Sequence, residues 1–181
     1  FKAIPWYTYP AIDYLASLDI KNKKVLEFGS GQSSYWWAER TQQVCSLEDS
    51  DFFFQKLNRK KPSNLKLFMC DTHLKHIGNA ELSAGYFDII VIDGFDRYQC
   101  FLNSLELISE DGIFIFDNSE GYHEHVDSLG KYPILKLMHN NSYKRMDYYG
   151  YAPGVIKKHC TSIFYKENSF INKLNLRIVR F

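Results

Sequence analysis

The segment 24–40, KVLEFGSGQSSYWWAER, limits what this chain can fold into more than any other stretch. Its apolar start, at 25–28, leads into a loop of small residues at 29–34, and a helical pattern of aromatic residues follows at once. This order predicts a strand, a tight turn and a helix. Glycines at such a turn let the backbone approach a ligand closely, and the new helix presents unpaired N–H groups there. We therefore expect a cofactor-binding loop.

Composition narrows the class of protein. The 181 residues are 45% hydrophobic, enough to bury a core, and we expect one domain over 1–181. The formal net charge of +1 argues against a nucleic-acid surface as the main function, and no apolar run is long enough to span a bilayer. We therefore expect no nucleic-acid or membrane partner. We also expect a cytoplasmic location, because the cysteines lack a CxxC pair and suit buried thiols in a reducing compartment. They are Cys45, Cys70, Cys100 and Cys160. The oligomeric state is open.

Residues 1–20 are predicted to form an N-terminal helix or lid segment. Apolar residues recur at helical spacing over 12–18 behind Pro10, which suits the first turn of a helix. The preceding PWYTYP motif, at 5–10, supplies aromatic rings that could either plug the core or cover a ligand, since both tasks use the same residue types. The aromatic residues are Trp6, Tyr7 and Tyr9.

Strand and helix patterns alternate along the rest of the chain. Strands are predicted at 43–48, 64–70, 85–93, 112–116, 134–138 and 160–166, and helices at 51–59, 101–108 and 120–129. Such alternation predicts an α/β fold with a Rossmann-like, doubly wound, mostly parallel sheet of seven strands. The last two strands lack a full crossover helix between them, so we expect a C-terminal antiparallel hairpin.

An acidic residue stands at the end of each of the first five predicted strands. These residues are Glu27, Glu48, Asp71, Asp93 and Asp117. In a parallel sheet the strand ends meet at one edge, so these side chains are predicted to surround one ligand crevice. Glu48, with Asp49 as its neighbour, is placed to accept hydrogen bonds from the hydroxyls of a ribose. That feature serves NAD and S-adenosylmethionine equally.

The pattern Glu27-x-Gly29-x-Gly31, with Ser33 in the position of a third glycine, resembles motif I of the class I S-adenosylmethionine-dependent methyltransferases. A dinucleotide site would instead require GxGxxG, which fails at Ser34. The resemblance implies that the loop, including Ser30, wraps the methionine end of the cofactor.

The same resemblance covers roughly 10–166 and assigns further roles by position. It implies that Asp71, with Thr72, meets the adenine amino group, and that Asp93 could face the cofactor ammonium. A turn-forming aspartate is the alternative for Asp71.

A second resemblance concerns the metal-dependent catechol-type and caffeoyl-CoA-type O-methyltransferases. Asp93, Asp117 and Asn118 match the places that hold a divalent cation in those enzymes, so the resemblance implies Mg²⁺ as a second cofactor. Where those enzymes carry a candidate base, a lysine, this chain has Asp96 and Arg97, and an arginine cannot take the proton. The Asp-Asn-Ser run at 117–119 would also suit a helix N-cap.

His123 is a candidate general base, because it follows shortly after the fifth strand. An exposed helix face would equally explain it. The sequence thus predicts a methyltransferase that uses S-adenosylmethionine on a small-molecule oxygen acceptor, with Asp93, Asp117 and His123 as catalytic candidates. A binding scaffold without turnover and an NAD-linked oxidoreductase remain alternatives.

Overall fold

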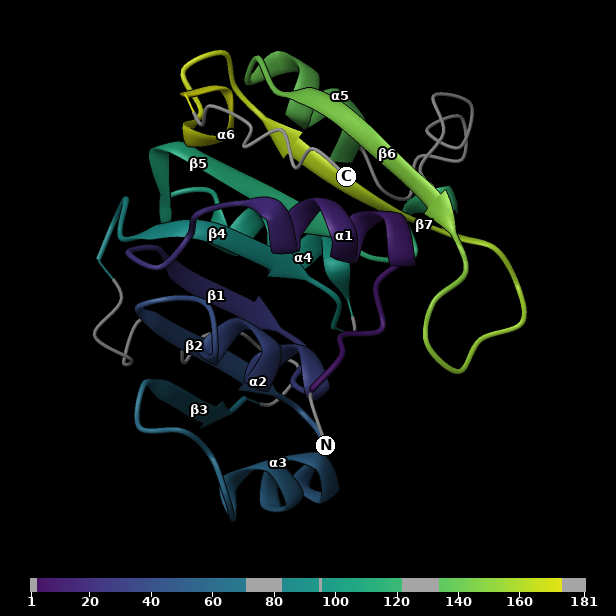
Figure 1. Cartoon of the computed structure of the whole chain (residues 1–181). Helices are drawn as coiled ribbons and strands as arrows, with labels where there is room; N and C mark the ends of the chain where they lie inside the picture. Colours follow the sequence, from purple (N-terminus) through teal and green to yellow (C-terminus); the bar gives the residue numbers. More distant parts are fainter. Residues whose placement is uncertain (1–2, 71–82, 95, 122–133, 174–181) are drawn as a thin grey trace.

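A computed structural model of the protein describes residues 3–70, 83–94, 96–121 and 134–173. In this part of the chain one seven-stranded sheet has the order β3-β2-β1-β4-β5-β7-β6 (Figure 1). The strands are β1 (Lys24–Phe28), β2 (Gln43–Glu48), β3 (Leu65–Met69), β4 (Phe87–Ile92), β5 (Ile108–Phe116), β6 (Lys144–Gly150) and β7 (His159–Tyr165). Strands β1 to β5 run parallel, and β7 is antiparallel to both β5 and β6. The doubly wound sheet with its closing hairpin is confirmed.

Helices cover both faces of the sheet. They are α1 (Tyr9–Ser17), α2 (Gln32–Ala38), α3 (Asp51–Asn58), α4 (Arg97–Ser104), α5 (Ile134–Asn140) and α6 (Phe170–Lys173). In Figure 1, α1 and α2 lie in front of the sheet and α4 lies behind it. Successive residues of a strand point to opposite faces, so Val25 packs in the front core with α1 and α2, while Leu26 packs in the rear core with α4 and α5. Continuous apolar strands are what two covered faces require.

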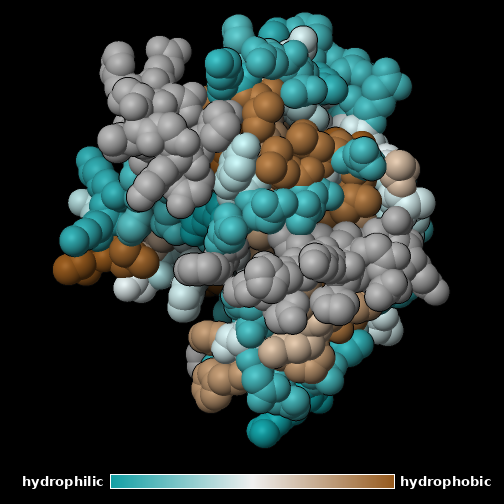
Figure 2. Space-filling model, turned by 180° about the vertical axis from the view of Figure 1, so that it is seen from behind, coloured by the Kyte–Doolittle hydropathy of each residue, from teal (hydrophilic) through white to brown (hydrophobic). Residues whose placement is uncertain are grey.

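Apolar side chains reach the surface on the rear face of the molecule (Figure 2). Figure 2 shows brown, apolar surface on the upper half of this face, beside polar residues and grey atoms. Half-buried apolar side chains pack against the rear core, among them Leu135 and Leu137 of α5 and Tyr98 of α4.

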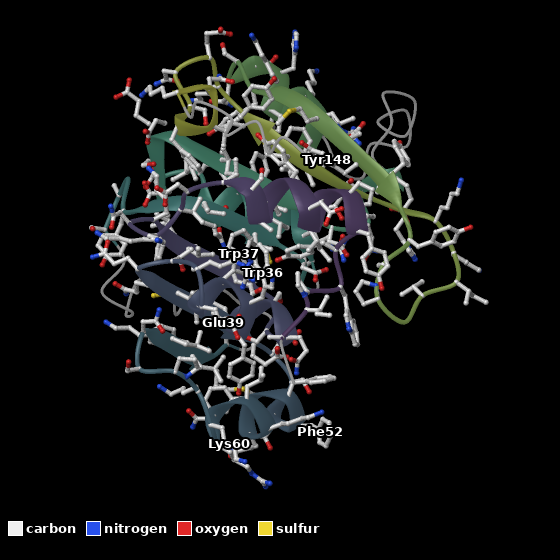
Figure 3. All side chains as sticks on the ribbon, in the orientation of Figure 1. Trp36, Trp37, Glu39, Phe52, Lys60 and Tyr148 are labelled. Atoms are coloured by element: carbon white, nitrogen blue, oxygen red, sulfur yellow. The ribbon has the colours of Figure 1, made fainter. Side chains whose placement is uncertain are left out.

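The N-terminal segment is tied to the front of the sheet and to the closing hairpin. Tyr7 is fully buried, and its hydroxyl accepts a hydrogen bond from Trp37 Nε1 at 3.0 Å. Figure 3 shows Trp37 near the centre of the molecule and Tyr148 on β6, beside α1. The Tyr148 ring stacks on Tyr14 of α1 at a centroid distance of 5.2 Å. Tyr7 is thus the core plug, whereas Trp6 is exposed and its role as a lid stays a prediction.

Two predicted elements differ from the structure. The segment 134–138, predicted as a strand, is the first part of helix α5, and the hairpin strand is β6 instead. Ile134 and Met138 are buried four residues apart, a helical spacing that a short apolar run conceals. Strand β6 escaped prediction because it lies at the sheet edge and carries charged residues. The predicted helix at 101–108 is α4, which begins and ends earlier, and Ile108 already belongs to β5.

The helix predicted at 120–129 lies mostly outside the described residues, although Ser119–Gly121 forms one turn of 3₁₀-helix. Among the helices described, none has the length and apolar character needed to cross a membrane.

Candidate active site

The loop between β1 and α2 is built around the buried carboxylate of Glu27. This side chain has no exposed surface, and its Oε2 accepts hydrogen bonds from Ser46 Oγ at 2.7 Å and from Ser34 Oγ. Ser34 Oγ in turn accepts from the backbone N–H of Gly31 at 3.0 Å. Ser30 Oγ lies 2.7 Å from Ser46 Oγ, which extends the network into the loop. The serines of the motif therefore hold the loop around Glu27.

One oxygen of Glu27 is left over. Oε1 is buried and has no hydrogen-bond partner among the described residues. Burial raises the pKa of Glu27 to about 6, although the neighbouring hydroxyls of Ser33, Ser34 and Ser46 oppose the rise. A buried carboxylate oxygen without a partner is costly, so this atom suits a ligand that brings its own positive charge or donor.

Gly29 lets the tips of β1 and β4 come together. Its φ is +88°, and a Cβ at this position would lie 2.9 Å from the backbone oxygen of Asp93. At Gly31, by contrast, an added Cβ would meet only Ser33 Oγ, at 3.9 Å. The backbone at Gly31 therefore borders open space, as a loop that receives a ligand requires.

Glu48 ends β2 with both carboxylate oxygens already engaged by the backbone. Oε2 accepts from the N–H of Ser30 at 2.8 Å, and Oε1 accepts from the N–H of Ser50 at 2.9 Å. Each carboxylate oxygen can accept a further hydrogen bond, so the group is held in place and can still bind a hydroxyl. Burial raises the pKa of Glu48, against these two hydrogen bonds. Its predicted neighbour Asp49 is exposed.

Asp93 and Asp117 follow neighbouring strands. The register pairs Ile92 of β4 with Phe116 of β5, so these two acids lie side by side at the strand tips. Burial, and then the charge of Asp117, raise the pKa of Asp93. Burial likewise raises the pKa of Asp117, whose Oδ1 accepts a hydrogen bond from Thr161 Oγ1 at 2.6 Å. The carboxylate of Asp117 is thereby tied to β7.

The predicted cation ligands surround a guanidinium group. Arg97 Nη2 donates to Asp93 Oδ1 and to Asn118 Oδ1, at 3.1 Å in each case. Nη1 donates to the backbone oxygen of Asp117. Within the described residues, no group of three or more histidine, cysteine, aspartate or glutamate side chains could hold a metal ion. The side-chain oxygens of Asp93 and Asn118 that were matched to the metal-dependent enzymes are hydrogen-bonded to Arg97, and a bound Mg²⁺ stays a prediction.

His159, the first residue of β7, is a site residue that sequence reasoning missed. Its Nδ1 lies 3.1 Å from Glu120 Oε1 and 3.2 Å from Asn118 Nδ2. A carboxylate can only accept, so the Glu120 contact requires a proton on Nδ1, which leaves Nε2 unprotonated in the neutral ring. The Asn118 amide nitrogen can only donate, so in this tautomer it makes no hydrogen bond to Nδ1. Nε2 is buried and lacks a partner among the described residues. An isolated histidine 41 residues from Asn118 gives no signal in the sequence.

Three predicted site residues lie outside the described residues: Asp71, Thr72 and His123. The structure brings four of the predicted acids to the carboxyl ends of parallel neighbouring strands, β1, β2, β4 and β5. They are Glu27, Glu48, Asp93 and Asp117.

Solved structures of methyltransferases are similar to this chain. No family model and no curated protein matches the sequence. Among solved structures, the O-methyltransferase TomG from Streptomyces achromogenes, in complex with SAM, is 16% identical with a TM-score of 0.63, covering 87% of this chain and 78% of that chain. A putative caffeoyl-CoA O-methyltransferase from Staphylococcus aureus is 19% identical with a TM-score of 0.62, covering 90% and 86%.

A third similar structure is that of an enzyme whose substrate is a tRNA. The tRNA (m1A58) methyltransferase TrmI from Aquifex aeolicus is 18% identical with a TM-score of 0.57, covering 92% of this chain and 72% of that chain. At such identities the likeness establishes the fold. The chain has the Rossmann-like fold of the class I S-adenosylmethionine-dependent methyltransferases.

Proposed function

We propose that this protein is a methyltransferase that binds S-adenosylmethionine at the tips of β1, β2 and β4 and methylates an oxygen of a small molecule. The observation that carries the proposal is the buried Glu27 Oε1, which has no partner among the described residues. A carboxylate buried in the core of a cofactor loop is stabilised by a nearby cation, and the ammonium group of S-adenosylmethionine supplies one.

The remaining residues of the loop divide into two groups. Ser33 and Ser34 are buried, and Ser34 donates a hydrogen bond to Glu27. Gly29, Ser30 and Gly31 form the half-buried turn that would wrap the methionine end. Glu48, fixed by two backbone N–H groups, would accept the ribose hydroxyls. Asp71 and Thr72 would serve the adenine, and Asp49 would lie beside the ribose.

The acceptor would enter beside Asp93 and Asp117. The sulfonium of the bound cofactor supplies the methyl group, and the protein has to hold an acceptor atom in line with it. His159 could take a proton from the acceptor, because Glu120 orients its ring and leaves Nε2 as the base. His123 remains a second candidate for this proton. An oxygen acceptor needs such a base more than an amine does, since an alcohol or phenol must lose its proton to become a strong nucleophile.

Two alternatives make different predictions. An NAD-linked oxidoreductase shares the glycine loop and Glu48, but it gives no reason for the buried Glu27. A binding scaffold would keep the cofactor pocket without turnover. A tRNA acceptor, like that of the Aquifex aeolicus tRNA methyltransferase, is a further candidate to test against the expected small molecule.

The test is transfer of a labelled methyl group from S-adenosylmethionine to a panel of phenols, carboxylic acids, amines and bulk tRNA. Label in a phenol or carboxylate product would support the proposal if it is lost in His159→Asn. It should be retained in the control His139→Asn, which replaces an exposed histidine. Binding of the cofactor without transfer to any acceptor would favour the scaffold. Label only in tRNA would refute the small-molecule acceptor.

A further inference from the structure

Arg97 gathers four oxygen atoms at the tips of β4 and β5. Its Nη2 donates to the side-chain oxygens of Asp93 and Asn118, and its Nη1 donates to the backbone oxygen of Asp117. Its Nε lies 3.3 Å from the backbone oxygen of Gly94, to which it also donates. Carboxylate, amide and carbonyl oxygens are the ligands that Mg²⁺, Mn²⁺ and Ca²⁺ prefer. The guanidinium therefore sits on the atoms that a hard divalent cation would need.

The backbone on either side of the cluster has an unusual conformation. Asp96 has a left-handed backbone, with φ at +44°, and caps helix α4 by accepting a hydrogen bond from the N–H of Gln99 at 3.3 Å. A non-glycine residue in this region is uncommon and persists only where its surroundings hold it. Asn118 is also left-handed, with φ at +48°. One of these left-handed residues, Asp96, directly precedes Arg97, and the other, Asn118, accepts a hydrogen bond from it.

The charges at this place also favour a guanidinium over a metal ion. Asp93 and Asp117 are neighbouring acids in a half-buried site, and the arginine side chain keeps 22% of its surface exposed. A guanidinium stays protonated under all ordinary conditions, so it supplies a permanent positive charge to the pair. A divalent cation entering the same place would have to displace these hydrogen bonds and would meet a like charge at close range.

We propose that Arg97 takes the place of a divalent cation in this protein, so that the tips of β4 and β5 carry their positive charge as a side chain and bind no metal ion. This inference concerns cation binding and does not rest on methyl transfer. It predicts that removing the guanidinium frees the four oxygens for a metal.

The experiment is titration of Mn²⁺ into the purified full chain, with the free ion followed by electron paramagnetic resonance. Arg97→Ala is compared with Arg59→Ala, which removes an exposed arginine at the end of α3 and changes the net charge equally. The wild type and Arg59→Ala should leave Mn²⁺ free. Arg97→Ala should bind one ion at least about tenfold more tightly than either, because a repelling charge has gone. Adding Asp93→Asn should abolish that binding.

Two results would overturn the proposal. One is stoichiometric Mn²⁺ binding by the wild type that Asp93→Asn removes. The other is a correctly folded Arg97→Ala that binds no more Mn²⁺ than Arg59→Ala. Circular dichroism and S-adenosylhomocysteine binding report folding separately, and Arg97→Gln, which keeps more of the side-chain volume, replaces Arg97→Ala if that variant does not fold. Failure of the wild type to bind S-adenosylhomocysteine would bear on the proposed function alone.

Discussion

At the scale of single residues, Glu27 links the stability of the protein to its proposed ligand. Burial raises the pKa of this carboxyl to about 6, against 4.5 for an ordinary glutamate. A carboxyl whose pKa is higher in the folded state binds its proton more tightly there. Its contribution to stability is therefore fully present below pH 4.5 and is lost as the pH rises through about 6.

Glu27→Gln should consequently stabilise the ligand-free protein at pH 8 by up to about 2 kcal/mol, and the gain should vanish near pH 4.5. Urea unfolding across this pH range measures the difference. Glu106→Gln, at an exposed glutamate, is the matched control and should show neither effect. An unchanged pH dependence in Glu27→Gln would mean that the buried carboxyl is not the source.

Gly29 gives a second prediction at this scale. Gly29→Ala should destabilise the protein by about 2–4 kcal/mol, because the left-handed backbone and the contact with the Asp93 oxygen both oppose a Cβ. Gly154 has a similar φ of +75° but no atom within 4 Å of an added Cβ, so Gly154→Ala should cost only about 1–2 kcal/mol. Denaturant midpoints compare the two. Equal losses would show that the approach of β1 to β4 tolerates a side chain.

Individual site residues were predictable where a local pattern exposed them. The sequence predicts Glu27 and Glu48 as site residues because an acid at the end of a short apolar strand is a visible signal. The sequence marks Arg97 only as a residue that cannot serve as the base, whereas its hydrogen-bond partners in the structure include Asn118, 21 positions away. The distances that define the cluster arise from the pairing of β4 with β5, which no local pattern encodes.

At the scale of elements, the N-terminal segment joins the front core to the closing hairpin. The backbone N–H of Thr8 donates to Thr161 Oγ1 at 3.0 Å, and the Thr161 hydroxyl donates to Asp117. The Thr8 hydroxyl donates to the backbone oxygen of Tyr148. The position of this segment is thereby connected to the acid at the tip of β5.

In the same segment, Tyr7→Phe should cost about 1–3 kcal/mol of stability. The buried Trp37 Nε1–H would lose its acceptor, while the packing of the ring is kept. The control is Tyr151→Phe, which removes the hydroxyl of an exposed tyrosine. Thermal unfolding of both variants measures the cost. A Tyr7→Phe protein as stable as the control would mean that this hydrogen bond contributes nothing net.

Elements with uniform burial were predicted best. Strand β4 is buried along most of its length, and its run of isoleucine and valine identifies it. Strand β6 alternates between exposed and half-buried residues at the sheet edge, and α5 is a seven-residue helix whose apolar residues resemble a strand. In both cases the environment, which is set by the neighbours in the sheet, decides the structure.

At the scale of the whole molecule, the order of the strands explains why the candidate site residues gather at the carboxyl ends of the parallel strands. Strands β1 and β4 are adjacent but lie far apart in the sequence, and the chain turns in opposite directions from them. Ligands of such sheets bind at this switch point, beyond the carboxyl ends of the strands. Alternating patterns predicted the parallel sheet, but they could not fix side-chain contacts such as that between Glu120 and His159. The single domain over 1–181 stays a prediction.

The last prediction joins this architecture to the cofactor. S-adenosylhomocysteine at a hundredfold excess over its dissociation constant should add about 2.7 kcal/mol to stability, or roughly 5–10 °C in the unfolding midpoint, whereas NADH should add nothing. The product retains the ammonium that we place at Glu27, so binding should release a proton near pH 6 and strengthen as the pH rises through that value. Calorimetry in buffers of different ionisation enthalpy detects the proton, and Glu27→Gln should abolish its release. Stabilisation by NADH in place of S-adenosylhomocysteine would instead establish a dinucleotide site, and proton release that persists in Glu27→Gln would assign it to another group.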